Sequence, residues 1–413
     1  MIGTAYVKKI ELENIRAFEK LSLDLGTADG QRMVSVIIGR NGTCKSTLLR
    51  CIAMGLCHES DAPALLAEFG GRLISEFAET GTIALTLVDG SGRTMGGIRL
   101  VIKNMKGRDM LADREASVSM EDFFVCGYGP SRGNTGASMM RDYRVLDSVA
   151  PLFDYSRNLV NIELMLRRVE DYLGTVRYNS AVMGIKRVLG LGREHKINYT
   201  KGGGVSVSGP GIGKNIPLEA WADGYRMTFN WLIDLYGWAL HADVITESGG
   251  IRGILLIDEV DQNLHPSMQS VLLSELQEAL PETQIFATTH SPLTALGTES
   301  ENVISLHRKG QVVEQVSVPL LTGYSADDAL LEEALFGTDP YPRQTRRKMD
   351  QFHELAAVSP VTRSVKQHAD IKKLAGELSP EGLPSFRGGD DLIVKKLDRI
   401  ADMLKKKRTH DQG

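Results

Sequence analysis

The chain has 413 residues, of which 42% are hydrophobic and 24% are charged, and its formal net charge is −4. This composition is typical of a globular protein that is long enough for one large domain or two ordinary ones. The weakly acidic balance excludes a global basic field that attracts nucleic acid, although a local basic patch stays open.

Cysteine spacing and the length of the apolar runs limit the class of protein further. The four cysteines show no zinc-binding spacing, and no apolar leader follows Met1. No apolar run is long enough to span a bilayer. We therefore expect a reduced, cytoplasmic protein without a membrane partner.

The first third of the chain is expected to be rich in strands. Alternating or continuous apolar residues predict strands over 6–18, 21–25, 33–38, 82–88 and 98–102. Apolar residues at helical spacing predict a helix over 61–79. The polar segment 104–120 is expected to be a mobile loop.

Helices dominate the middle of the chain. An apolar stripe with arginines on its other side predicts a helical insert over about 142–192. A glycine-rich interval follows, and then a long apolar helix over 218–242 that contains all three tryptophans.

The last part of the predicted sheet alternates strands with helices. Strands are expected over 254–257, 284–288, 302–306 and 312–318, and helices over 266–280 and 292–297. Beyond Leu320 the chain becomes charged and helical, over 324–336 and 344–358. A final amphipathic helix is predicted from Asp390, either for a partner or for packing on its own domain.

A phosphate-loop pattern lies between the strand over 33–38 and the helix that begins near Thr47. Its residues are Gly39, Arg40, Asn41, Gly42, Thr43, Cys44, Lys45, Ser46 and Thr47. Backbone N–H groups of such a loop and the start of its helix bind phosphate. Lys45 is then expected to reach the β- and γ-phosphates of ATP, and Ser46 to bind Mg²⁺. The alternative is a strand–turn–helix without a ligand.

Cys44 departs from this pattern, which has glycine at that position. Glycine is favoured where the backbone approaches a ligand closely or takes a positive φ. We expect Cys44 to lower either nucleotide affinity or the rate of hydrolysis.

Two carboxylates end the apolar strand over 254–257. Ligands of parallel sheets bind at the carboxyl ends of the strands, which is where Asp258 and Glu259 are expected. Asp258 is predicted to hold Mg²⁺ through water, and Glu259 to polarise the attacking water. His290 follows the next strand and is predicted to stand beside the γ-phosphate, although a lone histidine is a weak signal.

Together these residues resemble the ABC-type ATPase heads of the SMC/RecF/OLD-like class. The resemblance implies that residues 221–226 are the signature segment, with Asp223, Gly224 and Tyr225 facing a phosphate and Ala222 replacing the usual serine. It also implies that Asp261 belongs to the D-loop and that Arg16 precedes the base-binding pocket.

The family's Q-loop glutamine has no counterpart in this sequence, because no glutamine lies between Gln31 and Gln262. The corresponding loop is expected near residues 127–132. Tyr128, Ser131 or Arg132 substitutes for the glutamine, or else this is a plain structural loop.

The resemblance implies an α/β fold. Residues 1–340 would form the ABC-ATPase head, with a phosphate-loop NTPase sheet, an N-terminal antiparallel β lobe and the helical insert. Residues 341–413 would form a helical C-terminal extension that docks a partner. In such heads the signature of one subunit covers the nucleotide of another, so we expect a homodimer around two ATP and leave higher assembly open.

Within this class the chain is most similar to the compact, Septu PtuA-like ATPases of anti-phage defence, over about residues 5–340. That likeness implies an ATPase that senses or gates a separate effector, typically an HNH nuclease, with nucleic acid reached through the complex. Two alternatives stay open. One is a RecF-like repair ATPase that acts on DNA directly, and the other is a nucleotide-dependent structural dimer with weak hydrolysis.

Overall fold

The computed structural model describes residues 5–27, 30–119, 123–132, 135–136, 143–200, 204–339, 341–358 and 362–378. The chain divides into two compact units, Met1–Asp339 and Pro340–Gly413. None of the helices in the described ranges has the length and apolar character that a membrane span requires.

A six-stranded sheet lies at the centre of the first unit, in the order β16-β15-β5-β14-β13-β9. Its strands are β5 (Val34–Ile38), β9 (Val125–Tyr128), β13 (Gly253–Ile257), β14 (Thr283–Thr288), β15 (Val303–Lys309) and β16 (Val312–Val316). Neighbours run parallel except for the β15–β16 hairpin. Every residue of β5, β13 and β14 is buried, because both faces of the sheet are covered.

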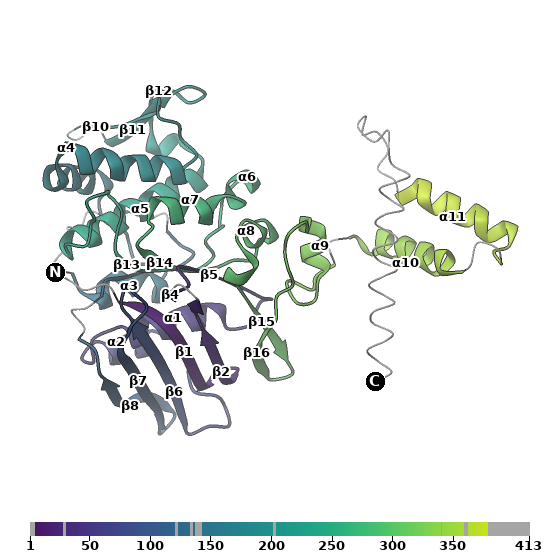
Figure 1. Cartoon of the computed structure of the whole chain (residues 1–413), viewed down its shortest axis with the longest axis horizontal. Coiled ribbons are helices and arrows are strands. Elements are labelled where there is room, and N and C mark those ends of the chain that lie inside the picture. The colour runs from purple at the N-terminus through teal and green to yellow at the C-terminus, as the bar shows by residue number, and fades with distance from the viewer. Residues whose placement is uncertain are drawn as a thin grey trace. The chain divides into compact units, whose positions relative to one another are not determined.

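A five-stranded antiparallel sheet, in the order β2-β1-β6-β7-β8, forms the N-terminal lobe. Its strands are β1 (Tyr6–Ile15), β2 (Phe18–Asp24), β6 (Thr80–Val88), β7 (Thr94–Met105) and β8 (Arg108–Ala116), and β3 (Gly26–Thr27) pairs with β4 (Gly30–Gln31). Helix α1 (Lys45–Gly55) shares one apolar core with this lobe and with one face of the central sheet, and α2 (Ala62–Ala67) and α3 (Val145–Phe153) join them (Figure 1).

Helices cover the other face of the central sheet, as Figure 1 shows. The insert helix α4 (Ile162–Val188) is kinked at Gly174, where φ is 68°. It packs on α5 (Asp223–His241) and α7 (Leu272–Ala279). The three-stranded sheet of β10 (Lys196–Thr200), β11 (Gly204–Gly209) and β12 (Gly213–Pro217) follows α4. Short helices complete the unit: η2 (Leu218–Ala220), α6 (Pro266–Gln269), α8 (Pro292–Leu296), η3 (Ser300–Asn302) and α9 (Ala326–Leu331).

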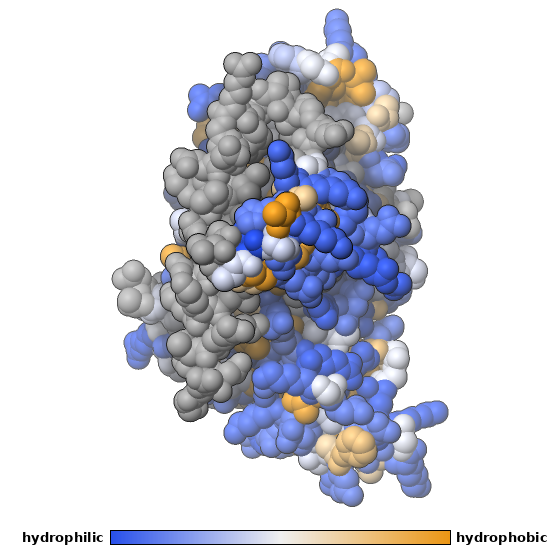
Figure 2. All heavy atoms as spheres, turned by 90° about the vertical axis from the view of Figure 1, so that its right-hand side faces the viewer, coloured by the Kyte–Doolittle hydropathy of each residue, from blue (hydrophilic) through white to orange (hydrophobic). Residues whose placement is uncertain are grey.

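The second unit contains α10 (Arg343–Ala357) and α11 (Val365–Leu378). A 2.8 Å ion pair between Lys348 and Glu377 joins the two helices, and neither helix has a buried residue. On the face drawn in Figure 2, the coloured residues are mainly hydrophilic and the apolar ones form small separate groups.

The predicted fold class is confirmed, with a mainly parallel sheet, an antiparallel N-terminal lobe, a helical insert and C-terminal helices. Several element predictions were wrong. Part of the segment expected as a loop over 104–120 is strand β8, whose polar residues lie on an exposed edge strand. Only α2 forms within 61–79, and Phe77 is 88% exposed. The helix over 266–280 is broken into two, and α11 was not predicted. The tail from Asp390 lies outside the described residues.

Candidate functional site

The loop between β5 and α1 has the backbone that a phosphate cradle requires. Gly39 has φ 149°, and a Cβ there would collide with the carbonyl oxygen of Leu306. Cys44 caps α1 in the left-handed region, at φ 62° and ψ 27°. The glycine of the family pattern is therefore the residue that this backbone favours, and Cys44 holds the conformation under strain.

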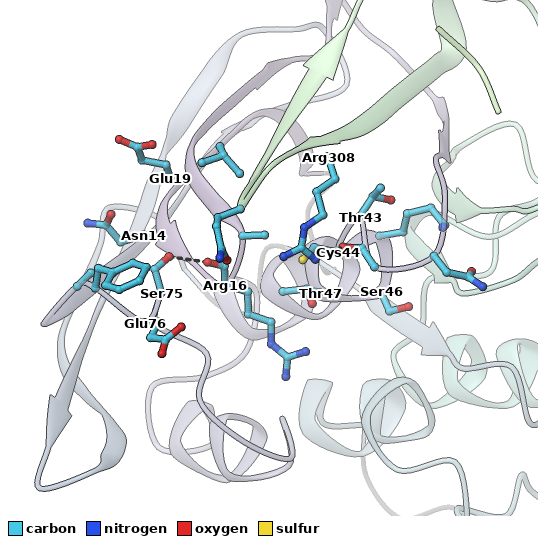
Figure 3. Close-up of a pocket in the computed structure, with 18 of the residues that line it drawn as sticks. Asn14, Arg16, Glu19, Thr43, Cys44, Ser46, Thr47, Ser75, Glu76 and Arg308 are labelled. Carbon is cyan, nitrogen blue, oxygen red and sulfur yellow. Dashed lines mark hydrogen bonds between the residues drawn. The ribbon is translucent and has the colours of Figure 1, made fainter. Parts of the chain in front are cut away.

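One cavity of about 860 Å³ opens beside this loop. Its walls come from the phosphate loop, the β1–β2 turn, residues 75–78, the ends of β13 and β14, and the β15–β16 hairpin (Figure 3). Predicted site residues that line it are Arg16, Asn41, Gly42, Thr43, Cys44, Lys45, Ser46, Thr47, Asp258, Glu259 and His290. Elements far apart in the sequence thus bring these side chains together.

Lys45 is buried, and its ammonium group is bound by the loop itself. Nζ donates to the carbonyl oxygen of Gly39 at 2.7 Å and to that of Arg40 at 3.3 Å. Burial lowers the pKa of Lys45 to about 8, against the opposing charges of Asp258 and Glu259. A phosphate in the loop can replace these two carbonyls as the partner of the ammonium group.

Arg40 is exposed and does not line the cavity. Its Nε donates to the carbonyl oxygen of Phe336 at 3.1 Å. Phe336 belongs to the turn after α9, so this contact joins the phosphate loop to the end of the first unit.

Asp258 and Ser46 supply oxygen atoms on the same cavity. Asp258 is 1% exposed and accepts a 2.5 Å hydrogen bond from Oγ1 of Thr288. Mg²⁺ in nucleotide sites takes one or two protein oxygens together with phosphate and water, and this pair fits that requirement. In the described ranges, no three His, Cys, Asp or Glu side chains are grouped to hold a metal.

Glu259 follows directly and has φ 49°, which is uncommon for a residue with a side chain. Its backbone N–H donates to Oγ1 of Thr288 at 2.8 Å. Its carbonyl oxygen accepts from the N–H of Gln262 at 3.0 Å and from the side chain of Arg132 at 2.6 Å. Strain of this kind persists only where the surroundings fix the residue, and it is frequent at functional sites.

His290 lies at the edge of the cavity, after β14. Partial burial and then the charge of Lys45 lower its pKa, so that the imidazole is neutral at pH 7. A neutral imidazole can donate one hydrogen bond to a phosphate oxygen without adding a charge.

Arg16 occupies the β1–β2 turn, which also lines the cavity. It has φ 47°, and its neighbour Asn14 has φ 53°. The Oγ of Ser75 donates to the carbonyl oxygen of Arg16 at 2.6 Å, a bond drawn in Figure 3, and Arg16 donates to the carbonyl oxygen of Phe69 at 3.0 Å. Residues 69–75 thus fix this turn.

The signature segment lies outside the cavity lining. Asp223 is exposed at the start of α5, and the ring of Tyr225 packs on Trp221. A Cβ at Gly224 would collide with the carbonyl oxygen of Asn263, so the segment packs directly on the one that follows Asp261. The close packing on Asn263 is sufficient by itself to explain glycine at 224.

Arg308 is a further cation of the cavity, which no pattern in the sequence indicated. Figure 3 shows its guanidinium reaching from the β15–β16 hairpin toward Cys44, and Nη1 lies 3.5 Å from the carbonyl oxygen of Gly42. Strand β15 pairs in parallel with β5, and Ser305 stands opposite Ile38. Since the phosphate loop begins just after Ile38, a residue just beyond Ser305 is brought to that loop. The strand order, which the sequence did not predict, was the missing signal.

Two family models match the chain. A model described as "AAA domain" matches residues 9–127, and one described as "AAA domain, putative AbiEii toxin, Type IV TA system" matches residues 231–296. The first match contains the phosphate loop, and the second contains Asp258, Glu259 and His290.

A comparison with known protein sequences gives a relative that matches most of the chain. The Septu protein PtuA of Bacillus mycoides (strain KBAB4) is 22% identical over 388 residues, which cover 91% of this chain and 50% of PtuA. The predicted resemblance to PtuA-like ATPases is confirmed. The chain spans about half the length of that relative.

Two further matches are a shorter one to a retron protein and a more distant one to a solved structure. The Retron Vc95 probable ATPase of Vibrio cholerae serotype O1 biovar El Tor is 35% identical over 81 residues, or 19% of this chain and 15% of that protein. The solved SMC head domain from Thermotoga maritima has a TM-score of 0.44 and 17% identity over 76% of this chain and 99% of that one.

Proposed function

We propose that this protein binds ATP with Mg²⁺ and hydrolyses it. The observation that carries the proposal is the single cavity that gathers Lys45, Asp258 and Glu259 around a strand–loop–helix phosphate cradle. Similarity to PtuA and to a probable retron ATPase supports the same activity.

The roles follow from where each side chain lies. Lys45 exchanges the carbonyl oxygens of Gly39 and Arg40 for phosphate oxygens when the nucleotide enters. Ser46, and Asp258 through water, would hold Mg²⁺, which would supply positive charge beside the phosphates. Glu259 orients and polarises the attacking water, and His290 donates a hydrogen bond to the γ-phosphate. Removing a group that positions the water typically slows the chemical step by about 100-fold or more.

The active form in this proposal is a homodimer. Asp223, Gly224, Tyr225 and Asp261 lie outside the cavity that contains the phosphate loop, so one chain offers them to the nucleotide of another. Two chains related by a two-fold axis then complete two equivalent sites, as expected for an isologous pair.

The physiological role that we propose is the gating of a separate effector, a nuclease, in anti-phage defence. Similarity to PtuA over most of this chain supports it. The C-terminal unit that begins at Pro340 is the proposed docking segment, since it forms a compact unit of its own beyond the head. The complex then reaches nucleic acid through the effector.

A nucleotide-dependent dimer with weak hydrolysis is the second candidate. The left-handed backbone at Cys44 favours it, because a side chain stands where the cradle requires glycine. Measurable turnover distinguishes the two candidates.

The test is ATP turnover by the wild-type chain and by Glu259→Gln, with size measured by light scattering in the presence of ATP. We expect Glu259→Gln to lose at least about 100-fold in kcat and to accumulate as an ATP-bound dimer. Glu247→Gln, an exposed position that precedes β13 whereas Asp258 and Glu259 follow it, is the matched control and should behave as wild type. Normal hydrolysis by Glu259→Gln would remove Glu259 from the mechanism.

A further inference from the structure

A buried guanidinium lies beneath the turn that contains Asp258 and Glu259. Arg132 is 3% exposed, and its two terminal nitrogens donate to the backbone of that turn. Nη1 reaches the carbonyl oxygen of Asp258 at 3.1 Å, and Nη2 reaches that of Glu259 at 2.6 Å. Burial lowers the pKa of Arg132 to about 10, so the group stays charged at neutral pH.

The strand pairing explains why these groups meet. Strand β9 runs parallel to β13, with Tyr128 opposite Ile257. The loop that follows β9 and the turn that follows β13 therefore leave the sheet side by side. Arg132 lies in the first of these segments, and Asp258 and Glu259 lie in the second.

This contact acts on a strained residue. Glu259 has φ 49°, a conformation that side chains disfavour. Thr288 fixes the turn from the β14 side, through its bonds to the carboxylate of Asp258 and the N–H of Glu259. Arg132 fixes the same turn from the β9 side, where it binds the two carbonyl oxygens.

We propose that Arg132 is a positioning residue, which holds Glu259 in its left-handed conformation and so directs the carboxylate into the cavity. Arg132 does not line that cavity, and both its terminal nitrogens bind backbone oxygens, so it acts through Glu259 rather than on the nucleotide. The inference rests on the proposed hydrolytic role of Glu259. A planar, two-pronged donor suits this task, because it binds two adjacent carbonyls at once.

The test is a double-mutant cycle between Arg132 and Glu259. Arg132→Met and Arg132→Lys are made in the wild-type chain and again in the Glu259→Gln background. For each protein, kcat for ATP, the Kd of ATP by calorimetry and the unfolding temperature are measured. Arg99→Met, an exposed site on β7, is the matched control for loss of an arginine.

In the wild-type background we expect Arg132→Met to lower kcat by about 30- to 100-fold, since displacing a catalytic group by about 1 Å can have an effect of that size. The Kd of ATP should stay within about threefold, and Arg132→Lys should recover part of the loss, because one donor remains. In the Glu259→Gln background the same substitutions should change the residual rate by less than about threefold.

Three results would overturn the inference. One is an equal fall in kcat in both backgrounds, which indicates a general structural role. Another is a parallel loss of ATP affinity, which indicates direct contact with nucleotide. The third is the absence of turnover by the wild-type chain, which overturns the proposed function and therefore also the inference.

If Arg132→Met does not fold, the same cycle made with Arg132→Lys gives the answer.

Discussion

The phosphate-loop edge of the central sheet and the signature segment at the start of α5 differ in whether one chain by itself forms a cavity for a ligand. At the first, Lys45, Asp258 and Glu259 line one cavity and lie within reach of a single ligand. At the second, Asp223 is exposed, and Gly224 is covered by the backbone of Asn263. One region is built around an opening and the other around a surface, and this difference supports the proposal that the second is completed by another chain.

The physical reason for glycine differs between the two regions. At Gly39 a positive φ and the close approach of Leu306 both require it, within a loop that lines an open cavity. At Gly224 the close approach of Asn263 alone is sufficient, so glycine there is weaker evidence for a phosphate. Substitutions that affect one region and leave the other intact test this difference.

Lys45→Ala should have the largest effect, because it removes the ammonium group that binds the phosphates in the proposed function. We expect the affinity for ATP to fall by more than about 100-fold, which is about 3 kcal/mol of binding free energy. Calorimetry measures this directly. Lys20→Ala, an exposed lysine on β2, is the control. An unchanged Kd in Lys45→Ala would remove the phosphate loop from the proposed site.

Gly224→Ala addresses the other region. The added Cβ collides with the carbonyl oxygen of Asn263, so we expect a loss of about 1 to 3 kcal/mol in unfolding free energy and a weaker ATP-dependent dimer. Binding of ATP by one chain should stay within about threefold, because Gly224 lies outside the cavity. Light scattering of the variant in the Glu259→Gln background, with ATP present, measures the dimer.

Gly376→Ala in α11 is the matched control for this substitution. Among the described residues, no atom outside the backbone of its own helix and its chain neighbours lies within 4 Å of the position that its Cβ would occupy, so it should keep the dimer. If Gly224→Ala were also to lose ATP binding by a single chain, the two regions would not be separable.

The pH dependence of ATP binding reports on Lys45. Its pKa is lowered to about 8 in the nucleotide-free protein, whereas bound phosphates favour the charged form. Below pH 8 the ammonium is already present, and affinity should be nearly constant. Above pH 8 binding must take up a proton, so affinity should fall by up to tenfold per pH unit.

Calorimetry at pH 9 in two buffers of different ionisation enthalpy should show this proton uptake. An affinity that stays flat between pH 8 and pH 10 would contradict the lowered pKa of Lys45. The pKa of His290 is also lowered, so its titration lies below this window.

The sequence predicted those parts of the fold and site that local patterns encode. Apolar runs located β5, β13 and β14, and the residues after these strands had to meet at one edge of the sheet. It did not predict α11, and the alternation that marks a half-buried strand is absent from the exposed edge strand β8.

The contacts of Arg132 and Arg308 could not be predicted for a different reason. Arg132 was one of three residues considered for the missing glutamine, but its bonds to the Asp258–Glu259 backbone depend on β9 lying beside β13. Arg308 resembles any solvated hairpin residue until β15 is known to lie beside β5. Such roles are set by strand order, which a single sequence does not show.

Cys44→Gly should give the smallest effect and tests whether the left-handed backbone weakens the phosphate loop. Cys44 has φ 62°, and a glycine there relieves about 1 kcal/mol of backbone strain, partly offset by the greater freedom of glycine in the unfolded chain. We expect a net gain of about 0.5 kcal/mol in unfolding free energy and a gain of a few-fold in ATP affinity. Cys44→Ala keeps the strain while removing the thiol, so it should show neither gain. If alanine matched glycine in thermal unfolding and in calorimetry, the thiol itself, and not the left-handed backbone, would be what weakens the site.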